Sequence, residues 1–280
     1  MSDYEWILVD DPAPGVRRIT LNRPEKRNAM TNGLRGDVFD ALAKADLDES
    51  VRVTIIRGAG KCFCAGYDIG GDRGEPTYQT AGGMAYWPRH VVEGWFRVWD
   101  LAKPVIAQVH GYCLAGGTEL ATSCDLVYVA EDAEIGYPVV RQFGSPDMQY
   151  HPWLMGMRNA MEAMLTGDAM SGTEAVEKGF ANRAFPLEEL DERVLEMAER
   201  IAKVPTDLQQ MNKRLVHHAM DVMGMRAAIR AGTELQALSM MTETSRGFQE
   251  NLKESVTGAL QKRDAQFGDY RTKEKREAGE

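Results

Sequence analysis

The chain has 280 residues, 44% hydrophobic and 27% charged, with a net charge of −9. This composition excludes collagen-like, disordered and disulfide-scaffold proteins, and the negative charge argues against nucleic acid as a partner, because phosphate binding needs a positive surface. We expect a cytoplasmic protein without signal peptide or membrane span, because the N-terminus lacks a basic segment before an apolar run and no stretch approaches about 18 apolar residues.

The first part of the chain predicts a hairpin, a helix and a strand. Strand patterns over Tyr4 to Val9 and Val16 to Leu21 flank the turn-rich segment Asp10 to Gly15. Thr31 suits a helix N-cap, because the apolar residues after it have the three- and four-residue spacing of a helix face. Another strand is predicted over Val51 to Ile56, before a glycine-rich loop.

The middle of the chain alternates helices and strands. Helices are predicted over Met84 to Leu101 and Thr118 to Ser123, and strands over Pro104 to Val109 and Asp125 to Val129. Such alternation predicts parallel pairing with right-handed crossovers, so we expect an α/β fold.

The last part of the chain is almost wholly helical in pattern. A helix beginning at Pro152 should end near Gly167, and Ser171 to Glu174 has the spacing of a capping box. Helices are predicted from Leu187 to Phe267, and the charged tail Arg271 to Glu280 is expected to fray.

Two loops rich in small residues each follow a predicted strand. The first covers Lys61 to Asp68, and the second covers His110 to Glu119, with the pair Gly116 and Gly117 where the chain enters a helix. N–H groups at a helix start point outward toward an anion. Two such donors aimed at one oxygen would form an oxyanion hole, although either loop alone is an ordinary turn.

Four ordered motifs together resemble the crotonase (enoyl-CoA hydratase/isomerase) family across nearly the whole length. They are Asn22 to Ala29, Phe63 to Asp68, Gly111 to Leu120 with Cys124-Asp125, and Leu165 to Asp168. The resemblance implies a crotonase-like α/β fold, a spiral of ββα units over residues 1–195. It also implies a helical region over residues 196–280 that supports trimerisation and covers the acyl-CoA.

The resemblance also implies the binding groups. The backbone N–H groups of Tyr67 and Gly116 would form the oxyanion hole. The residues implied to bind CoA are Lys26, Arg27, Ala65 and, reaching the nucleotide of a neighbouring subunit, Lys262. For Arg27 and Lys262 a solvated basic surface is an equally good interpretation.

Glu119 matches one of the two catalytic glutamates of family hydratases, although a carboxylate there also suits the helix dipole. The second glutamate is expected at position 139, which holds Val139. A further carboxylate, Asp147, resembles the aspartate of dienoyl-CoA isomerases, some double-bond isomerases and chlorobenzoyl-CoA dehalogenase. We favour a catalytic role for Asp147 over turn chemistry, because a carboxylate facing an apolar pocket can have its pKa raised into the working range.

The acyl pocket is predicted to include Tyr137, Val139, His151 and Trp153. Aromatic residues are more often packing, and His151 is expected to shape the pocket rather than transfer protons.

The predicted substrate is an acyl-CoA thioester, without a metal or redox cofactor. Glu119 and Asp147 would act as acid and base, in hydration of an enoyl-CoA or in migration of its double bond. Migration is slightly favoured, because Val139 removes a usual partner for activating water. Alternatives are hydrolysis or carbon–carbon cleavage of a cyclic keto-acyl-CoA, and acyl-CoA binding without turnover. The family implies a homotrimer or a hexamer of two trimers.

Overall fold

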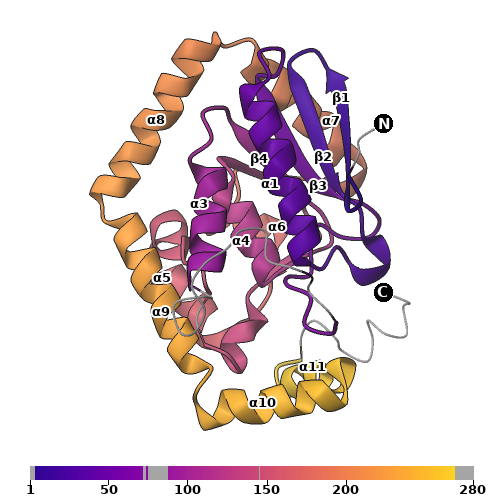
Figure 1. The fold of residues 1–280 in the computed structure, drawn as a ribbon, viewed down its shortest axis with the longest axis vertical. Coiled ribbons are helices and arrows are strands. Elements are labelled where there is room, and N and C mark those ends of the chain that lie inside the picture. The colour runs from indigo at the N-terminus through magenta and orange to yellow at the C-terminus, as the bar shows by residue number, and fades with distance from the viewer. Residues whose placement is uncertain (1–3, 72–73, 75–87, 145, 269–280) are drawn as a thin grey trace.

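The computed structural model describes residues 4–71, 74, 88–144 and 146–268. A six-stranded sheet lies at its centre, in the order β1-β2-β3-β4-β6-β9, parallel except for the antiparallel β1–β2 pair (Figure 1). The strands are β1 (Ile7–Ala13), β2 (Val16–Leu21), β3 (Val53–Gly58), β4 (Val105–Val109), β6 (Leu126–Ala130) and β9 (Arg183–Phe185). Strand β4 is buried along its whole length, which explains why all its residues except Gln108 are apolar.

A second sheet has three strands, and one of them leads directly into α4 (Gly116–Ser123). It consists of β5 (Tyr112–Leu114), β7 (Glu134–Gly136) and β8 (Met170–Ser171), with β5 and β7 parallel and β8 antiparallel to β7. Because this sheet holds β5 at a fixed register, it also positions Ala115 and the start of α4, which follow β5 directly.

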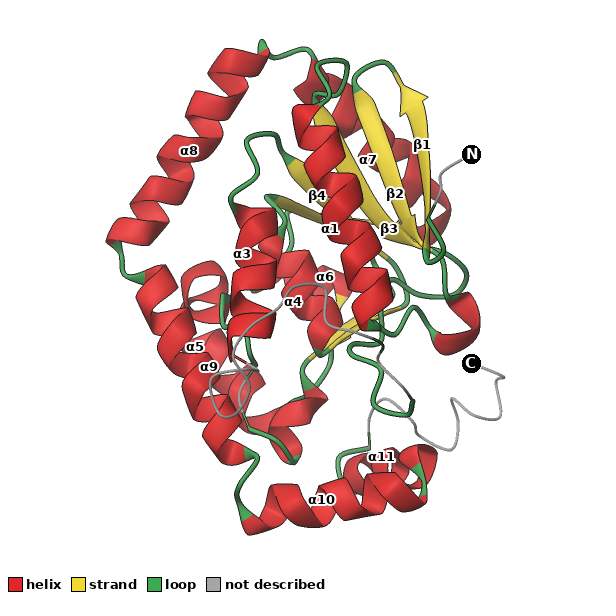
Figure 2. Ribbon diagram, viewed as in Figure 1, coloured by secondary structure: helices red, strands yellow, loops and turns green. Residues whose placement is uncertain are grey.

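Helices surround the two sheets, as Figure 2 shows. They are η1 (Pro24–Lys26), α1 (Asn32–Leu47), η3 (Arg89–Glu93), α3 (Gly94–Trp99), α4 (Gly116–Ser123), η4 (Pro138–Arg141), α5 (His151–Thr166), α6 (Gly172–Glu177) and α7 (Leu187–Ala202). Helix α7 spans the predicted boundary between residues 195 and 196, and its buried side packs against β3, β4 and β6. The division into a core and a C-terminal region stays a prediction.

The remaining helices form an arm that runs down one side and along the lower end of the molecule in Figure 1. They are α8 (Thr206–Val222), α9 (Met225–Ser239), α10 (Glu243–Glu254) and α11 (Val256–Asp264). In the described part of the chain, no helix combines the length and the apolar character needed to cross a bilayer.

Local signals in the sequence correspond to observed contacts. The Thr31 hydroxyl accepts from the Leu34 amide at 3.1 Å, and Ser171 and Glu174 form a reciprocal capping box. Gly167 ends α5 in the left-handed region at φ 68°. The predicted helix Met84 to Leu101 begins outside the described residues, and its described part is η3 and α3. The charged tail also lies outside them.

Candidate active site

The two small-residue loops lie side by side, as the sequence predicted. The backbones of Cys64 and Cys113 form an isolated parallel β-bridge, and the Leu114 amide donates to the Cys64 carbonyl at 3.0 Å. A Cβ added at Gly116 would lie 2.8 Å from two ring carbons of Tyr67, so a glycine is needed for this close approach. The loops therefore bring Tyr67 and Gly116 together.

The backbone at the start of α4 is strained. Ala115 has φ 50° and ψ −121°, a conformation that L-residues rarely adopt. Within the described chain, neither the Gly116 amide nor the Gly117 amide donates a hydrogen bond to a protein group. The bend at Ala115 thus precedes two amides that have donor capacity for an anionic atom.

Glu119 is buried at 1% exposure in the first turn of this short helix, and three donors from separate segments reach its carboxyl group. The Tyr67 hydroxyl donates to Oε2 at 2.8 Å, the Tyr137 hydroxyl donates to Oε1 at 3.3 Å, and the Asp147 amide donates to Oε1 at 3.2 Å. These bonds fix the carboxyl group and favour its ionised form.

Burial and the hydrogen bonds have opposite effects on the pKa of Glu119. Burial raises the pKa of Glu119, while the hydrogen bonds from Tyr67, Asp147 and Tyr137 and the charge of Arg35 oppose the rise. Burial and the nearby Glu119 charge also raise the pKa of the Tyr67 and Tyr137 hydroxyls well above 10, so both stay protonated as donors. A carboxyl group with a raised pKa is suited to proton transfer near neutral pH.

Asp147 lies close to Glu119, as its amide contact shows, and is itself buried at 3% exposure. Its charge raises the pKa of both Tyr67 and Tyr137, in addition to the larger effects of burial and of Glu119. The Thr233 hydroxyl of α9 donates to its carbonyl, so Asp147 is held at both its N–H and its C=O. The structure therefore brings Glu119 and Asp147 together.

The predicted acyl-pocket residues are distributed over η4 and α5. Val139 is half-buried in η4 and provides no proton-transfer group where family hydratases have a glutamate. Trp153 is half-buried on the first turn of α5 and packs against the core. Their place in an acyl pocket stays a prediction.

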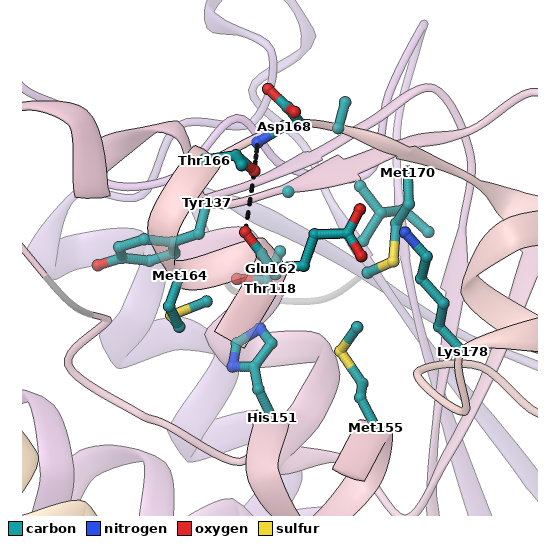
Figure 3. A pocket seen from close by; sticks show the side chains of 14 residues that line it. Thr118, Tyr137, His151, Met155, Glu162, Met164, Thr166, Asp168, Met170 and Lys178 are labelled. Carbon is teal, nitrogen blue, oxygen red and sulfur yellow. Dashed lines mark hydrogen bonds between the residues drawn. The ribbon is translucent and has the colours of Figure 1, made fainter. Parts of the chain in front are cut away.

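Tyr137 and His151 border a small cavity of about 30 Å³ (Figure 3). Neither Glu119 nor Asp147 lines it, and the Tyr137 hydroxyl points away from it. Within the described chain His151 Nδ1 has no hydrogen-bond partner, and burial lowers the pKa of the imidazole to about 4. The cavity is about the size of one or two water molecules, and the prediction that His151 lines the acyl pocket remains untested.

Three of the predicted CoA-binding residues lie together. Lys26 ends η1, Arg27 follows it with φ 53°, and the Ala65 amide donates to the Arg27 carbonyl at 3.0 Å. Both basic side chains are exposed, and the Arg27 guanidinium lies 5.3 Å from the ring centre of Tyr112. Lys262 is exposed on α11.

The sequence interpretation did not single out two residues of this site. The Trp95 indole donates to the Tyr67 hydroxyl at 2.9 Å, and Arg35 is 1% exposed with its guanidinium 5.7 Å from the Tyr67 ring centre. A signal for Arg35 exists, because it lies three and four residues before Val38 and Phe39, within the apolar face of the predicted helix.

Comparisons with known proteins agree with this arrangement. An enoyl-CoA hydratase crystal structure from Mycobacterium smegmatis superposes with a TM-score of 0.88 at 29% identity, covering 96% of this chain and 97% of that one. Mevalonyl-coenzyme A hydratase sidH of Aspergillus fumigatus is 30% identical over 268 residues, 93% of this chain and 94% of the relative. The mitochondrial enoyl-CoA hydratase of Pongo abelii is 29% identical over 273 residues, 96% of this chain and 89% of the relative.

The fold and the paired loops define a protein of the crotonase class. The sequence pattern of the enoyl-CoA hydratase/isomerase family matches residues 12–271. The chain belongs to this family, and it is an enzyme of the crotonase superfamily.

Proposed function

We propose that the chain moves protons beside the carbonyl of an enoyl-CoA thioester, and that double-bond migration is its main reaction. The amides of Tyr67 and Gly116 hold the thioester oxygen, and Glu119 and Asp147 act as acid and base. The observation that carries this proposal is the pairing of two buried carboxylates beside the strained turn at Ala115. A proton next to a thioester is too weakly acidic without such an oxyanion hole, since one donor is worth about 3–4 kcal/mol.

Migration needs one group to remove a proton and one to return it, and two carboxylates suffice. Hydration also needs a positioned water. Val139 cannot hold one by hydrogen bonding, and this favours migration.

Hydration is the second candidate, and the names of the relatives favour it. Both relatives above are named hydratases, as is the superposed structure. With Val139 apolar, Asp147 would have to orient the attacking water in place of the missing glutamate.

The test offers the purified protein 2-enoyl-CoA and 3-enoyl-CoA thioesters in D₂O and weighs the products. Migration exchanges protons for deuterons at carbon without adding water, hydration adds water, and hydrolysis or carbon–carbon cleavage gives fragments. Tight CoA binding without any product would identify a binding protein.

The carboxylates are tested by Glu119→Gln and Asp147→Asn. Each is expected to reduce kcat by about 10²–10⁴-fold. The matched control is Glu162→Gln, an exposed carboxyl group of α5, which should keep the parent rate. Parent rates in both site variants would remove the carboxylates from the mechanism.

The same proposal extends to binding and assembly. Lys26 and Arg27 would offset the CoA phosphates, because the chain is acidic overall. The apolar side chains exposed on α8 and α9 would be covered in a homotrimer or hexamer. They are Leu208, Met211, Leu215, Val216, Val222, Leu235 and Leu238.

A further inference from the structure

A buried arginine lies next to the proposed site and has no place in the mechanism above. Arg35 is 1% exposed, and within the described chain it forms no ion pair. An uncompensated charge inside a protein is costly, so a nearby negative group is expected to balance it.

The guanidinium is held firmly on one side by His90. Its Nη1 lies 2.6 Å from His90 Nε2, and its Nη2 donates to the His90 carbonyl at 3.0 Å. A guanidinium has only donors, so Nε2 accepts in this contact, and His90 brings no negative charge. The same nitrogen also lies 3.1 Å from Asn32 Oδ1. A Cβ at Gly94 would lie 2.6 Å from Nη2, so the absence of a side chain at Gly94 makes room for the cation.

On its other sides the guanidinium is surrounded by aromatic rings. The ring centres of Trp95, Phe39 and Tyr67 lie 5.0, 5.3 and 5.7 Å from its central carbon. Aromatic faces attract a cation, most strongly where water is excluded. Two of these rings continue toward Glu119, because the Trp95 indole donates to the Tyr67 hydroxyl, which donates to Glu119 Oε2.

We propose that Arg35 is a positioning residue of the reaction, and that its buried guanidinium is the counter-charge of the Glu119 carboxylate, acting through the ring of Tyr67. The cation orients the phenol, and it favours the ionised form of Glu119. The charge of Arg35 indeed lowers the pKa of Glu119, against the larger effect of burial. The other titratable groups that influence Glu119 are Tyr67, Tyr137, Asp147 and Cys64.

The test compares three variants by the pH profile of kcat/KM. Arg35→Met removes the charge and the hydrogen bonds, Arg35→Gln removes the charge but can still donate to His90, and Arg35→Lys retains the charge. Loss of the cation stabilises protonated Glu119. The limb controlled by Glu119 should therefore move up by about one pH unit in the Met and Gln variants, whether Glu119 acts as acid or base. The Lys variant should keep that limb close to the parent.

Arg97→Met is the matched control, because it removes an exposed positive charge on α3. Its profile should coincide with that of the parent. If Arg35→Met does not fold, the Gln and Lys variants carry the comparison. A Gln variant that is folded and active with the parent profile would show that Arg35 is purely structural.

This inference rests on the proposed role of Glu119, but the two can fail separately. In protein labelled with ¹³C at glutamate carboxyl groups, the Glu119 signal is assigned by its loss in Glu119→Gln, and its titration needs no turnover. An upward shift in Arg35→Gln supports the counter-charge even if Glu119→Gln keeps its activity, which would overturn only the proposed function. An unshifted titration overturns the counter-charge, whatever the rates.

Discussion

The orientation of the Glu119 carboxyl group depends on Tyr67 and Trp95, which are distant from it in the sequence. Its shortest bond, 2.8 Å, comes from the Tyr67 hydroxyl, and Trp95 in turn donates to that hydroxyl. Tyr67 therefore has two distinct features, a backbone amide in the proposed oxyanion hole and a phenol that orients the acid.

Tyr67→Phe separates these two features, because it keeps the backbone and deletes the hydroxyl. The variant leaves the buried Trp95 N–H without this acceptor and Glu119 with one donor fewer. We expect a loss of about 1–3 kcal/mol in the free energy of unfolding, and a lower kcat. Urea denaturation and steady-state kinetics measure the two effects. Tyr128→Phe, at another buried tyrosine, is the control and should change kcat little.

The buried imidazole of His151 predicts a pH dependence of stability. Burial lowers its pKa from 6.5 to about 4. The unfolded chain therefore binds the proton more readily between these two values, and stability falls as pH drops from 6.5 to about 4. The contribution is at most about 3.5 kcal/mol.

His151→Gln removes this titration. Relative to the parent, its free energy of unfolding should improve as pH falls through that window, as measured by urea denaturation at several pH values. His218→Gln, at an exposed histidine, should give a constant difference. A constant difference for His151→Gln as well would contradict a buried neutral imidazole.

Much of the residue-level site was predictable from local sequence. The loops with Tyr67 and Gly116 and the residues Glu119 and Asp147 follow from motifs, and the structure places them together. The contacts of Arg35 with Trp95 join parts of the chain that are distant in sequence, and no local pattern encodes such a distance. The position of Arg35 on an apolar helix face was the one local indication that its side chain is buried.

At the scale of elements, the C-terminal helices hold the end of η4 at Arg141 and Gln142. Arg141 of η4 pairs with Asp264 of α11 at 3.0 Å, with both side chains almost fully buried. The Ser245 hydroxyl of α10 donates to the Gln142 carbonyl at 2.7 Å. These contacts attach the arm to the segment that carries Val139 and Asp147.

Asp264→Ala should detach α11. It leaves the buried guanidiniums of Arg141 and Arg263 without this carboxylate, at a cost of about 3–5 kcal/mol. Hydrogen exchange in α11 should become faster, and mass spectrometry measures this directly. Glu250→Gln breaks an exposed ion pair with Lys253 on α10 and should leave exchange in α11 unchanged. Unchanged exchange in Asp264→Ala would show that other contacts hold the helix.

Elements with strong local signals were predicted well, and irregular ones were not. The N-cap at Thr31 and the capping box at Ser171 need only neighbouring residues. Within α5, Gly156 has φ 71° and interrupts the helix, although its periodic sequence predicted a continuous one. The breaks between the C-terminal helices fall on local signals: Pro205 precedes α8, Gly224 precedes α9 at φ 82°, and the Thr242 and Ser255 hydroxyls cap α10 and α11.

For the whole molecule, the arm presents apolar side chains outward. Met211 and Leu215 lie one turn apart on α8 and are 66% and 71% exposed. Such a face is costly in water, which supports the proposed homo-oligomer.

The double variant Met211→Glu with Leu215→Glu is expected to reduce the molar mass in solution to that of one chain, because charges are costly in a buried interface. Light scattering after size exclusion measures this. Leu187→Glu, at an exposed leucine of α7, is the matched control and should keep the parent mass. A double variant with the parent mass would place the interface elsewhere.

Helix α9 has two opposite faces. Leu235 and Leu238 are exposed, whereas Thr233 is fully buried and donates to the Asp147 carbonyl. A displacement of α9 would therefore move the backbone of Asp147, because the Thr233 hydroxyl is bonded to its carbonyl. If neighbouring subunits pack on the exposed face of α9, dilution of the oligomer below its dissociation midpoint should lower the specific activity. The circular dichroism spectrum should stay unchanged.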